Sequence, residues 1–381
     1  MVQPKKTESA AVSGVSERDA ALDGLRAEID AVDARLLEDL NERARLVEAV
    51  GRLKRETDTT VYEPSRERRI VEGLLSGNPG PFPNSGIGPV FREIISATRS
   101  LEEPVQIAYL GPEGTFTHQA ARHQFGALAH LASVPTVTDV FAAVEGGKVE
   151  LGVVPVENTT EGIVTQSYDA LAHFDVTICA EIMLPISQDL LSKSGRLEDV
   201  VRVASHPQGL AQCRRWLERN LPEVERIETT STSSAARRAA EDAGAAAIGS
   251  TLAAEVYGLR AIESGIEDRR DNSTRFVVIG KNEPSPSGND LTCAVFTIRK
   301  DQAGGLFHLI EPFASNGVNL TSIQLRPIHG KPWEYLFFID VEGHRSSPSV
   351  AAGLEGAAQV AHSSRVLGSF PRADLDRGRR R

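Results

Sequence analysis

Residues 25–54 read LRAEIDAVDARLLEDLNERARLVEAVGRLK. Apolar side chains recur in and around this stretch at steps of three and four residues, which is the period of one face of an α-helix. They are Leu22, Leu25, Ile29, Val32, Leu36, Leu46, Val50 and Leu53. The pattern predicts one helix of roughly 35 residues, about 50 Å long. Such a helix cannot bury its apolar face alone, so it must pack on shorter helices or on a second copy of itself.

Two shorter helices are predicted to follow the long one. Pro64 suits the first turn of the first of them, and the Gly- and Pro-rich stretch 77–89 separates the two. Their apolar positions are Ile70, Val71, Leu74 and Leu75 in one helix and Val90, Phe91, Ile94 and Ile95 in the other. Residues 18–103 are therefore predicted to form a small all-helical domain, preceded by a disordered tail at residues 1–17.

After Pro104 the sequence changes to short apolar strands separated by Ala-rich helical stretches. This alternation predicts a parallel α/β region over residues 104–281, and its two sets of strands suggest two lobes with a cleft between them. The predicted strands are residues 105–111, 150–158, 176–182, 200–206, 245–250 and 275–281.

A third region follows the Pro- and Ser-rich linker 282–290. Its pattern of strand, helix, strand, strand and helix fits a small ferredoxin-like α+β domain at residues 290–370, with a basic tail at residues 371–381. A chain of 381 residues is long enough for this multi-domain organisation.

The composition limits the classes of partner and compartment. A formal net charge of −10 argues against nucleic acid and anionic membranes as partners. The cysteines Cys179, Cys213 and Cys293 are odd in number and have no metal-ligand spacing, which is typical of a protein in a reducing cytosol. We therefore expect a cytoplasmic protein without a metal or other cofactor, a signal peptide or a membrane span.

Three cations on the long predicted helix bear on its function. Arg43 stands where the apolar series predicts an apolar residue, and Lys54 returns close to the same face about 16 Å further on. Arg26 lies on a different face and would serve only a site on another helix or a neighbouring molecule. Buried cations are costly unless an anion pairs with them, which indicates an anionic ligand. A solvated charged face is the alternative interpretation.

Residues 22–102, including SRERRI and FREIISATRSLE, resemble the small all-helical chorismate mutases. The resemblance implies a dimer of interlocked helices and a unimolecular rearrangement. Catalysis there means folding a flexible dianion into a reactive chair and stabilising charge on its ether oxygen. By position, Arg26, Arg43, Lys54 and Arg66 would bind the two carboxylates, and Glu63, Glu67, Thr98 and Glu102 would face the hydroxyl and ether side.

Glu102 falls where these mutases carry Gln or Glu facing the ether oxygen. A carboxyl group donates a hydrogen bond only when it is protonated. We therefore expect mutase efficiency to fall as the pH rises, and Glu102→Gln to flatten that dependence.

Polar clusters end several strands of the α/β region, in the segments 108–116, 154–162, 205–213 and 272–276. Open α/β sheets bind ligands at such strand ends. Each cluster taken alone also fits a helix cap or a loop. Taken together and in this order, the clusters resemble the prephenate dehydratases across residues 104–281.

The resemblance to prephenate dehydratases implies a two-lobed fold like that of type II periplasmic binding proteins, with Thr-Arg-Phe at residues 274–276 as the catalytic signature. The reaction expels carbon dioxide and the ring hydroxyl, which needs a proton or a strong hydrogen bond as it leaves. Thr274 is the expected donor. His118 and His206 are alternative proton donors or structural histidines. Asn158, Ser205, Gln212 and Arg275 would position the carboxylates and the ketone.

The last region resembles an ACT domain, a module that pairs across a dimer to bind amino acids. Gly304, Gly305 and Leu306 match the segment that lines the phenylalanine site in these enzymes. A second motif, Glu-Ser-Arg-Pro in the family, is Gln324-Leu325-Arg326-Pro327 here, so two of its four residues differ.

The three modules together predict a bifunctional enzyme of phenylalanine biosynthesis. It would take chorismate through prephenate to phenylpyruvate, as a homodimer or higher homo-oligomer, with phenylalanine as effector. An arogenate-preferring dehydratase is one alternative, and a non-catalytic amino-acid sensor is another. Thr274, Arg43 and Lys54 argue against the sensor, because a sensor has no use for them.

Overall fold

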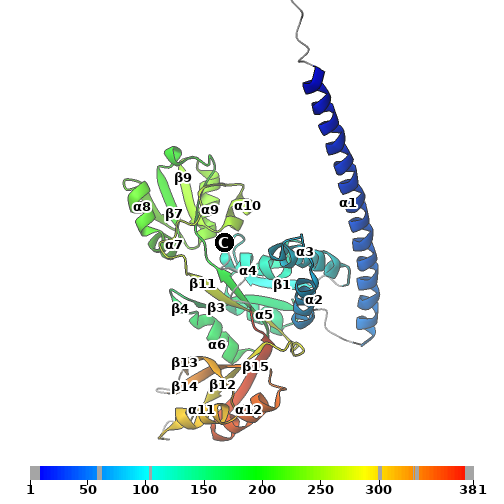
Figure 1. The fold of residues 1–381 in the computed structure, drawn as a ribbon. Coiled ribbons are helices and arrows are strands. Elements are labelled where there is room, and N and C mark those ends of the chain that lie inside the picture. Colours follow the sequence, from blue (N-terminus) through cyan, green and yellow to red (C-terminus); the bar gives the residue numbers. More distant parts are fainter. Residues whose placement is uncertain are drawn as a thin grey trace, which may run out of the picture. The chain divides into compact units, whose positions relative to one another are not determined.

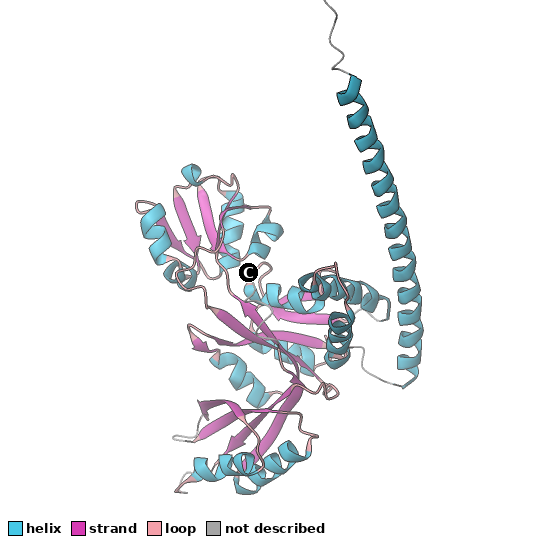
Figure 2. Ribbon diagram, in the orientation of Figure 1, coloured by secondary structure: helices cyan, strands magenta, loops and turns pink. Residues whose placement is uncertain are grey.

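The computed structural model describes residues 9–57, 62–102, 105–298, 303–328, 330 and 334–373. Figure 1 labels its helices and strands, and Figure 2 distinguishes them by type. The chain divides into two compact units, one of Met1–Thr59 with Leu101–Glu103 and one of Thr60–Ser100 with Pro104–Arg381. This division cuts through the stretch 18–103 that the sequence predicted as one helical domain.

The first unit is dominated by helix α1, Ser9–Thr57, which has 49 residues. It begins inside the segment predicted as a disordered tail, so the helix is longer than its apolar pattern indicated. Its apolar face is exposed, since Leu25, Ile29 and Leu36 keep 59%, 58% and 53% of their surface accessible. A helix with this face in water gains little stability by itself.

The second unit begins with helix α2, Pro64–Gly77, and most of helix α3, Asn84–Glu102. Pro64 lies in the first turn of α2, as predicted. Helix α3 begins inside the stretch 77–89 that was predicted to separate the helices. Pro89 lies within α3. It has no backbone N–H to donate, so one hydrogen bond of the helix is missing there, but the helix continues to Glu102.

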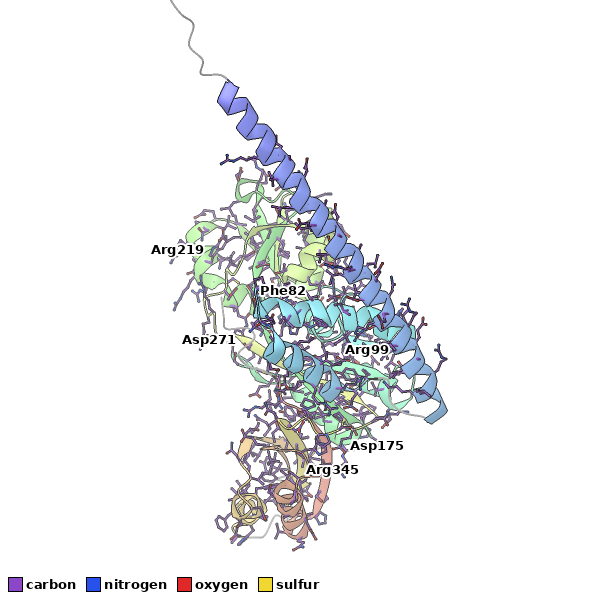
Figure 3. The ribbon with its side chains drawn as sticks, turned by 45° about the vertical axis from the view of Figure 1, so that its right-hand side comes forward. Phe82, Arg99, Asp175, Arg219, Asp271 and Arg345 are labelled. Atoms are coloured by element: carbon purple, nitrogen blue, oxygen red, sulfur yellow. The ribbon has the colours of Figure 1, made fainter. Side chains whose placement is uncertain are left out.

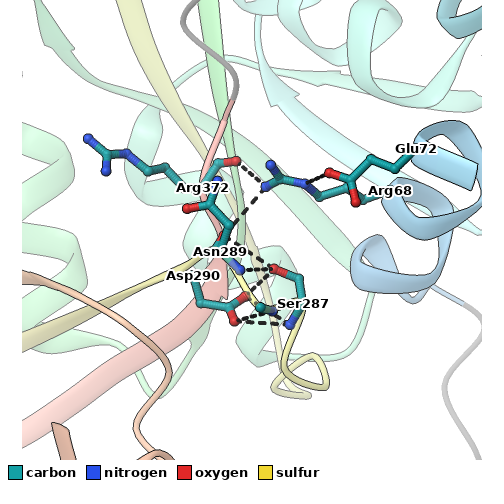
Figure 4. A network of polar contacts seen from close by, with 7 residues as sticks. Arg68, Glu72, Ser287, Asn289, Asp290 and Arg372 are labelled. Carbon is teal, nitrogen blue, oxygen red and sulfur yellow. Dashed lines mark hydrogen bonds and ion pairs between the residues drawn. The ribbon is translucent and has the colours of Figure 1, made fainter. Parts of the chain in front are cut away.

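Helices α2 and α3 pack on the α/β region. Tyr62, just before α2, belongs to one hydrophobic cluster with Val105 and Phe125, and its ring centroid is 5.1 Å from that of Phe125. Arg68 donates hydrogen bonds to the carbonyl oxygens of Arg372 at 2.6 Å and Asn289 at 3.4 Å (Figure 4). Tyr62 therefore extends the core of the α/β region, and Arg68 ties α2 to the two residues that flank the C-terminal sheet in the sequence.

The first lobe of the α/β region is a mixed sheet in the order β2-β1-β3-β11-β5, with β4 paired to β3. Strand β1 is parallel to β2 and β3, whereas β11 is antiparallel to β3 and β5. The prediction of a parallel sheet therefore holds only for part of this lobe. Strand β11 runs antiparallel because it enters the sheet on the chain's return from the second lobe. Its elements are β1 Gln106–Leu110, α4 Phe116–Phe125, β2 His130–Val134, α5 Val137–Glu145, β3 Leu151–Asn158, β4 Gly162–Ile163, α6 Thr165–His173, β5 Thr177–Pro185 and β11 Ser273–Gly280.

The second lobe is a five-stranded sheet in the order β10-β6-β9-β7-β8. The chain enters this lobe after β5 and leaves it before β11, so two connections join the lobes. Its elements are β6 Asp189–Ser192, η1 Leu197–Asp199, β7 Arg202–Ser205, α7 Pro207–Gln212, α8 Arg214–Asn220, β8 Glu225–Glu228, α9 Thr232–Glu241, β9 Ala245–Gly249, α10 Thr251–Tyr257 and β10 Arg260–Glu263.

The C-terminal region is an antiparallel sheet in the order β13-β14-β12-β15 with two helices. Phe296, Leu309 and Phe313 belong to the core between the sheet and its helices. The other face of the sheet shares a cluster with the first lobe, in which the rings of Phe338 and Tyr168 lie 4.9 Å apart. The sequence prediction lacked the last strand, β15. The elements are β12 Asp290–Thr297, α11 Gly305–Ser315, β13 Leu320–Pro327, β14 Tyr335–Glu342, α12 Pro348–Val360 and β15 Ser363–Pro371.

Two features are absent from the described residues. Their helices include none with a stretch apolar and long enough to cross a bilayer. The same part of the chain holds no cluster of three or more His, Cys, Asp or Glu side chains suited to a metal ion.

Candidate active sites

A cavity of about 620 Å³ is lined by residues of both α/β lobes. Three of the predicted dehydratase residues, Thr274, Asn158 and Gln212, lie in its wall. The first two come from adjacent positions of the antiparallel pair β3 and β11, and Gln212 comes from the end of α7. The cavity therefore brings together residues that are 116 positions apart in sequence.

The Asn158 amide makes the Thr274 hydroxyl oxygen a hydrogen-bond acceptor. Asn158 Oδ1 accepts the backbone N–H groups of Thr160 at 2.9 Å and Glu161 at 3.1 Å, which assigns the other amide atom as nitrogen. That nitrogen donates to Thr274 Oγ1 at 2.8 Å and to Asn272 Oδ1 at 2.9 Å. A hydroxyl that accepts this bond keeps its own proton to donate elsewhere. Thr274 is thus equipped to donate into the cavity.

A second polar pair lies in the wall of the cavity. Gln188 Nε2 donates to Gln212 Oε1 at 3.1 Å, and the Gln188 side chain is buried. The remaining amide atoms, Gln188 Oε1 and Gln212 Nε2, have no hydrogen-bond partner in this structure. Sequence reasoning missed Gln188, because a glutamine between two strands carries no motif.

The described residues that line the cavity include neither arginine nor lysine. Instead, the N-termini of α4 and α9 reach it from the two lobes, with Thr115 and Ser231 as their N-caps. Thr117 and Thr232 add hydroxyl groups to these first turns. Helix N-termini favour anions through free N–H groups and the helix dipole. The sequence analysis did not single out the second of these N-termini, although the Ser/Thr-rich run 229–234 is a local signal for it.

Two predicted dehydratase residues are engaged elsewhere. Ser205 is fully buried and donates to the carbonyl oxygen of Ile248 at 2.9 Å. Arg275 donates to Glu181 Oε1 and to Asp340 Oδ2, both at 2.6 Å. Successive side chains of a strand point to opposite faces, so Arg275 points away from the cavity that Thr274 lines. The prediction that these two residues position substrate does not match this arrangement.

The two histidines considered as proton donors differ in placement. His206 lines the cavity, and its Nδ1 accepts the backbone N–H of Gln208 at 3.3 Å. His118 is not part of the wall. Its Nδ1 accepts the backbone N–H of Gly114 at 3.0 Å, its ring stacks on Tyr109, and burial lowers its pKa. His118 is therefore a neutral, structural histidine.

The predicted mutase residues are distributed over both units. Arg26, Arg43 and Lys54 are on α1, where eleven residues separate the last two and place them on one face. Arg26 is exposed and pairs with Asp23 at 3.1 Å. Glu63, Arg66 and Glu67 are at the start of α2, and Thr98 is on α3. The structure describes each group within its own unit, and the side chain of Glu102 lies outside the described residues.

Glu63 and Glu67 already have partners within the second unit. Glu63 accepts the backbone N–H of Ser285 at 3.2 Å. Glu67 forms an ion pair with Arg99, whose guanidinium also lies 5.5 Å from the ring centroid of Tyr62 (Arg99 is labelled in Figure 3). Arg99 was not singled out from the sequence, because its role depends on packing between helices.

Thr98 and Arg66 differ in exposure. Thr98 is buried and donates to the carbonyl oxygen of Ile94 at 2.8 Å, within its own helix. Arg66 is exposed at the start of α2. Arg66 therefore presents its guanidinium to solvent, whereas the Thr98 hydroxyl is bonded within α3.

The predicted regulatory residues fall into two groups. Gly304 caps α11 with a φ of 74°, Gly305 is buried where a Cβ would come within 3.1 Å of the Ile298 side chain, and Leu306 is 40% exposed. On β13, Gln324 and Arg326 share one face of the strand, whereas Leu325 points to the other and is 47% exposed. Pro327 ends the strand.

Comparisons with known proteins agree with this architecture. Family models for chorismate mutase type II, prephenate dehydratase and the ACT domain match residues 25–103, 107–284 and 294–356. A bifunctional chorismate mutase/prephenate dehydratase of Aquifex aeolicus is 44% identical over 92% of this chain and 98% of its own. One of Pseudomonas aeruginosa is 41% identical over 93% of this chain and 98% of its own.

A solved structure extends the likeness. Prephenate dehydratase of Arthrobacter aurescens, in complex with L-Phe, has 34% identity and a TM-score of 0.66 over 71% of this chain and 91% of that one. The predicted fold class and the predicted pair of enzymatic activities, an isomerase and a lyase, are confirmed. The chain belongs to the family of bifunctional chorismate mutase/prephenate dehydratases.

Proposed function

We propose that Thr274 carries the dehydratase step by donating a hydrogen bond to the ring hydroxyl of prephenate as it leaves. The C–C bond to the ring carboxylate breaks, its electron pair enters the ring, and the C–O bond breaks. The products are phenylpyruvate, carbon dioxide and, after one proton is taken up, water. The carrying observation is the bond from Asn158 Nδ2 to Thr274 Oγ1, which leaves the threonine proton available.

The two carboxylates of prephenate would be bound by uncharged donors. The first turns of α4 and α9 offer backbone N–H groups and hydroxyls from opposite lobes, and Gln212 adds an amide. This arrangement supports a small dianion bound between the lobes, in a site whose described lining has no fixed positive charge.

For the mutase step, we infer a site that binds the chorismate dianion with cations of α1 and α2. Arg26, Arg43, Lys54 and Arg66 would bind the carboxylates, and Glu63, Glu67, Thr98 and Glu102 would lie on the ether side. The exposed apolar face of α1 supports a homodimer in which two copies of the helix cover each other. We assign the domains to residues 18–103, 104–281 and 290–370, between tails at 1–17 and 371–381, in a cytoplasmic enzyme.

Phenylalanine is the proposed effector. The match to the ACT domain and the L-Phe complex of the Arthrobacter aurescens enzyme support it. Because Gln324 and Leu325 replace the acidic and hydroxyl residues of the family motif, we expect inhibition only at high phenylalanine concentration. Losing one charge-assisted hydrogen bond would weaken binding by roughly 1.5–3 kcal/mol, or about ten- to a hundredfold. Gln324→Glu with Leu325→Ser should then tighten inhibition.

One assay tests the proposed function. Purified full-length protein receives chorismate, and prephenate and phenylpyruvate are followed with and without phenylalanine. We expect both products in sequence. Thr274→Val, which keeps the shape but has no hydroxyl, should stop at prephenate, while Thr274→Ser should retain activity. Full phenylpyruvate formation by Thr274→Val would refute the role of the hydroxyl, and faster turnover of arogenate than of prephenate would reassign the substrate.

A further inference from the structure

Helix α6 is continuous with the wall of the dehydratase cavity. Residues 161–164, immediately before it, line the cavity. Within its first turn, Ser167 Oγ donates to the carbonyl oxygen of Pro155, another residue of the wall, at 2.5 Å. The backbone N–H of Val164 bonds to the carbonyl oxygen of Val156 at 2.8 Å. Any displacement of α6 therefore moves this side of the cavity.

The C-terminal sheet holds the same helix at its middle. Arg326 of β13 makes a forked contact with Asp169, with Nε to Oδ1 at 3.0 Å, Nη2 to Oδ1 at 2.9 Å and Nη2 to Oδ2 at 2.8 Å. The two side chains are 16% and 34% exposed. Such forked arginine–carboxylate contacts fix orientation as well as distance.

The sheet also holds the end of α6. Arg365 of β15 donates to the carbonyl oxygens of Leu171 and, at 3.0 Å, Phe174. Figure 1 shows α6 between strand β4 and the sheet of β13 and β14. Tyr168 and Leu171 also pack α6 into the core shared with Phe338 of β14, and the forked contact with Asp169 adds a directional ion pair at the middle of the helix.

We propose that Arg326 is a positioning residue of the dehydratase, which acts through Asp169 and α6 on the cavity wall at residues 161–164. The inference rests on the proposed dehydratase function of that cavity. Arg326 lies in the motif 324–327, but this inference gives it a role other than contact with phenylalanine. A ligand that displaces β13 would displace α6 through this contact, which links effector binding to substrate binding.

The test uses full-length Arg326→Gln, Asp169→Asn and their combination, with prephenate as substrate. We expect kcat/KM for prephenate to fall about tenfold in each single variant, with most of the change in KM. The double variant should be no worse than either single one, because both changes break one contact. Mutase turnover of chorismate should stay within about twofold of the wild type.

Two further variants separate positioning from simple loss of stability. Arg345→Gln removes another arginine of the C-terminal region, in the connection between β14 and α12. Arg345 pairs with Glu283 at 3.3 Å, and its loss should leave KM unchanged. The exchange Arg326→Asp with Asp169→Arg should recover at least part of the lost kcat/KM. Phenylalanine should still bind to Arg326→Gln in calorimetry but inhibit it less than the wild type.

Some results would overturn the inference. They are an unchanged KM in folded Arg326→Gln, additive losses in the double variant, or an equal loss in Arg345→Gln. A wild-type enzyme unable to convert prephenate would instead refute the proposed function, so the two failures are distinguishable.

Discussion

The long helix α1 and the pair α2–α3 come from one stretch of sequence with one helical resemblance, yet they are stabilised differently. Helix α1 keeps its apolar face exposed and forms a unit of its own. Helices α2 and α3 bury theirs, with Val71, Ile87 and Ile95 all below 9% exposure, in the unit that contains the α/β region. The difference teaches that a module recognised by its sequence need not coincide with a unit of packing.

Several contacts join α2 and α3 to the dehydratase part. Gln124 donates to the Tyr62 hydroxyl at 3.0 Å, and Glu93 accepts the backbone N–H of Ala127 at 2.9 Å. We therefore expect changes on α1 to affect the mutase reaction alone, and changes on α2 or α3 to affect the dehydratase as well.

The largest expected effect is on activity. Arg43→Ala should lower mutase turnover by about a hundred- to a thousandfold, because it removes a charge that stabilises the transition state. Dehydratase activity on supplied prephenate should remain nearly intact. Thr274→Ala should do the reverse. Separate assays on chorismate and prephenate measure both, and loss of both activities in a folded single variant would show that the sites are one functional unit.

A smaller effect is expected when the contact between α3 and α2 is broken. The Arg99 and Glu67 side chains are 10% and 22% exposed. Arg99→Met removes the cation and leaves the Glu67 carboxylate without this ion pair. Loss of one partner of a buried pair costs about 3–5 kcal/mol, and partial exposure reduces that to about 3 kcal/mol here. Unfolding in urea, monitored by the loss of dehydratase activity, measures this change in the free energy of unfolding.

The control for Arg99→Met is Arg69→Met, because Arg69 is exposed on α2. We expect it to change the free energy of unfolding by less than about 0.5 kcal/mol. If both variants unfold at the same urea concentration as the wild type, α2 and α3 do not stabilise the dehydratase part.

The sequence predicted the order of the modules and the strand-end position of Thr274, because period and turn residues are local signals. The Thr-Arg-Phe motif was carried over as a unit, and it gave no sign that alternation along β11 places the Arg275 side chain on the opposite face from Thr274. The pairing of Arg275 with Asp340 was beyond reach. It depends on how the C-terminal sheet packs on the first lobe, which no local pattern encodes.

A further prediction concerns the exposed face of α1. Leu36 is 53% exposed, and burying a leucine contributes about 1.5–3 kcal/mol. If two copies of α1 cover each other, Leu36→Ser should raise the dimer dissociation constant at least about tenfold and lower mutase activity at low protein concentration. Analytical ultracentrifugation measures the first. A dimer of unchanged strength would place the interface elsewhere, and the dehydratase should unfold as before in either case.

The smallest expected effect is a difference between α1 and the unit of α2 and α3 in how the free energy of unfolding depends on pH. Burial, and after it the Glu67 carboxylate, raises the pKa of Tyr62 above its ordinary value of about 10. The neutral phenol is thus favoured in the folded protein, and its contribution is complete below pH 10. Above that, the unfolded chain releases the proton first, and stability falls by about 1.4 kcal/mol per pH unit.

Tyr62→Phe should remove this one component of the alkaline loss, at the cost of about 1 kcal/mol for the bond from Gln124. Unfolding free energies of the wild type and the variant, measured at pH 9, 10 and 11, should therefore converge as the pH rises. Other buried phenols, such as that of Tyr168, contribute equally to both proteins and cancel in the difference. Parallel curves would mean that Tyr62 is accessible to water. Residues 1–59 contain no tyrosine, so the unfolding of α1 should lack this dependence altogether.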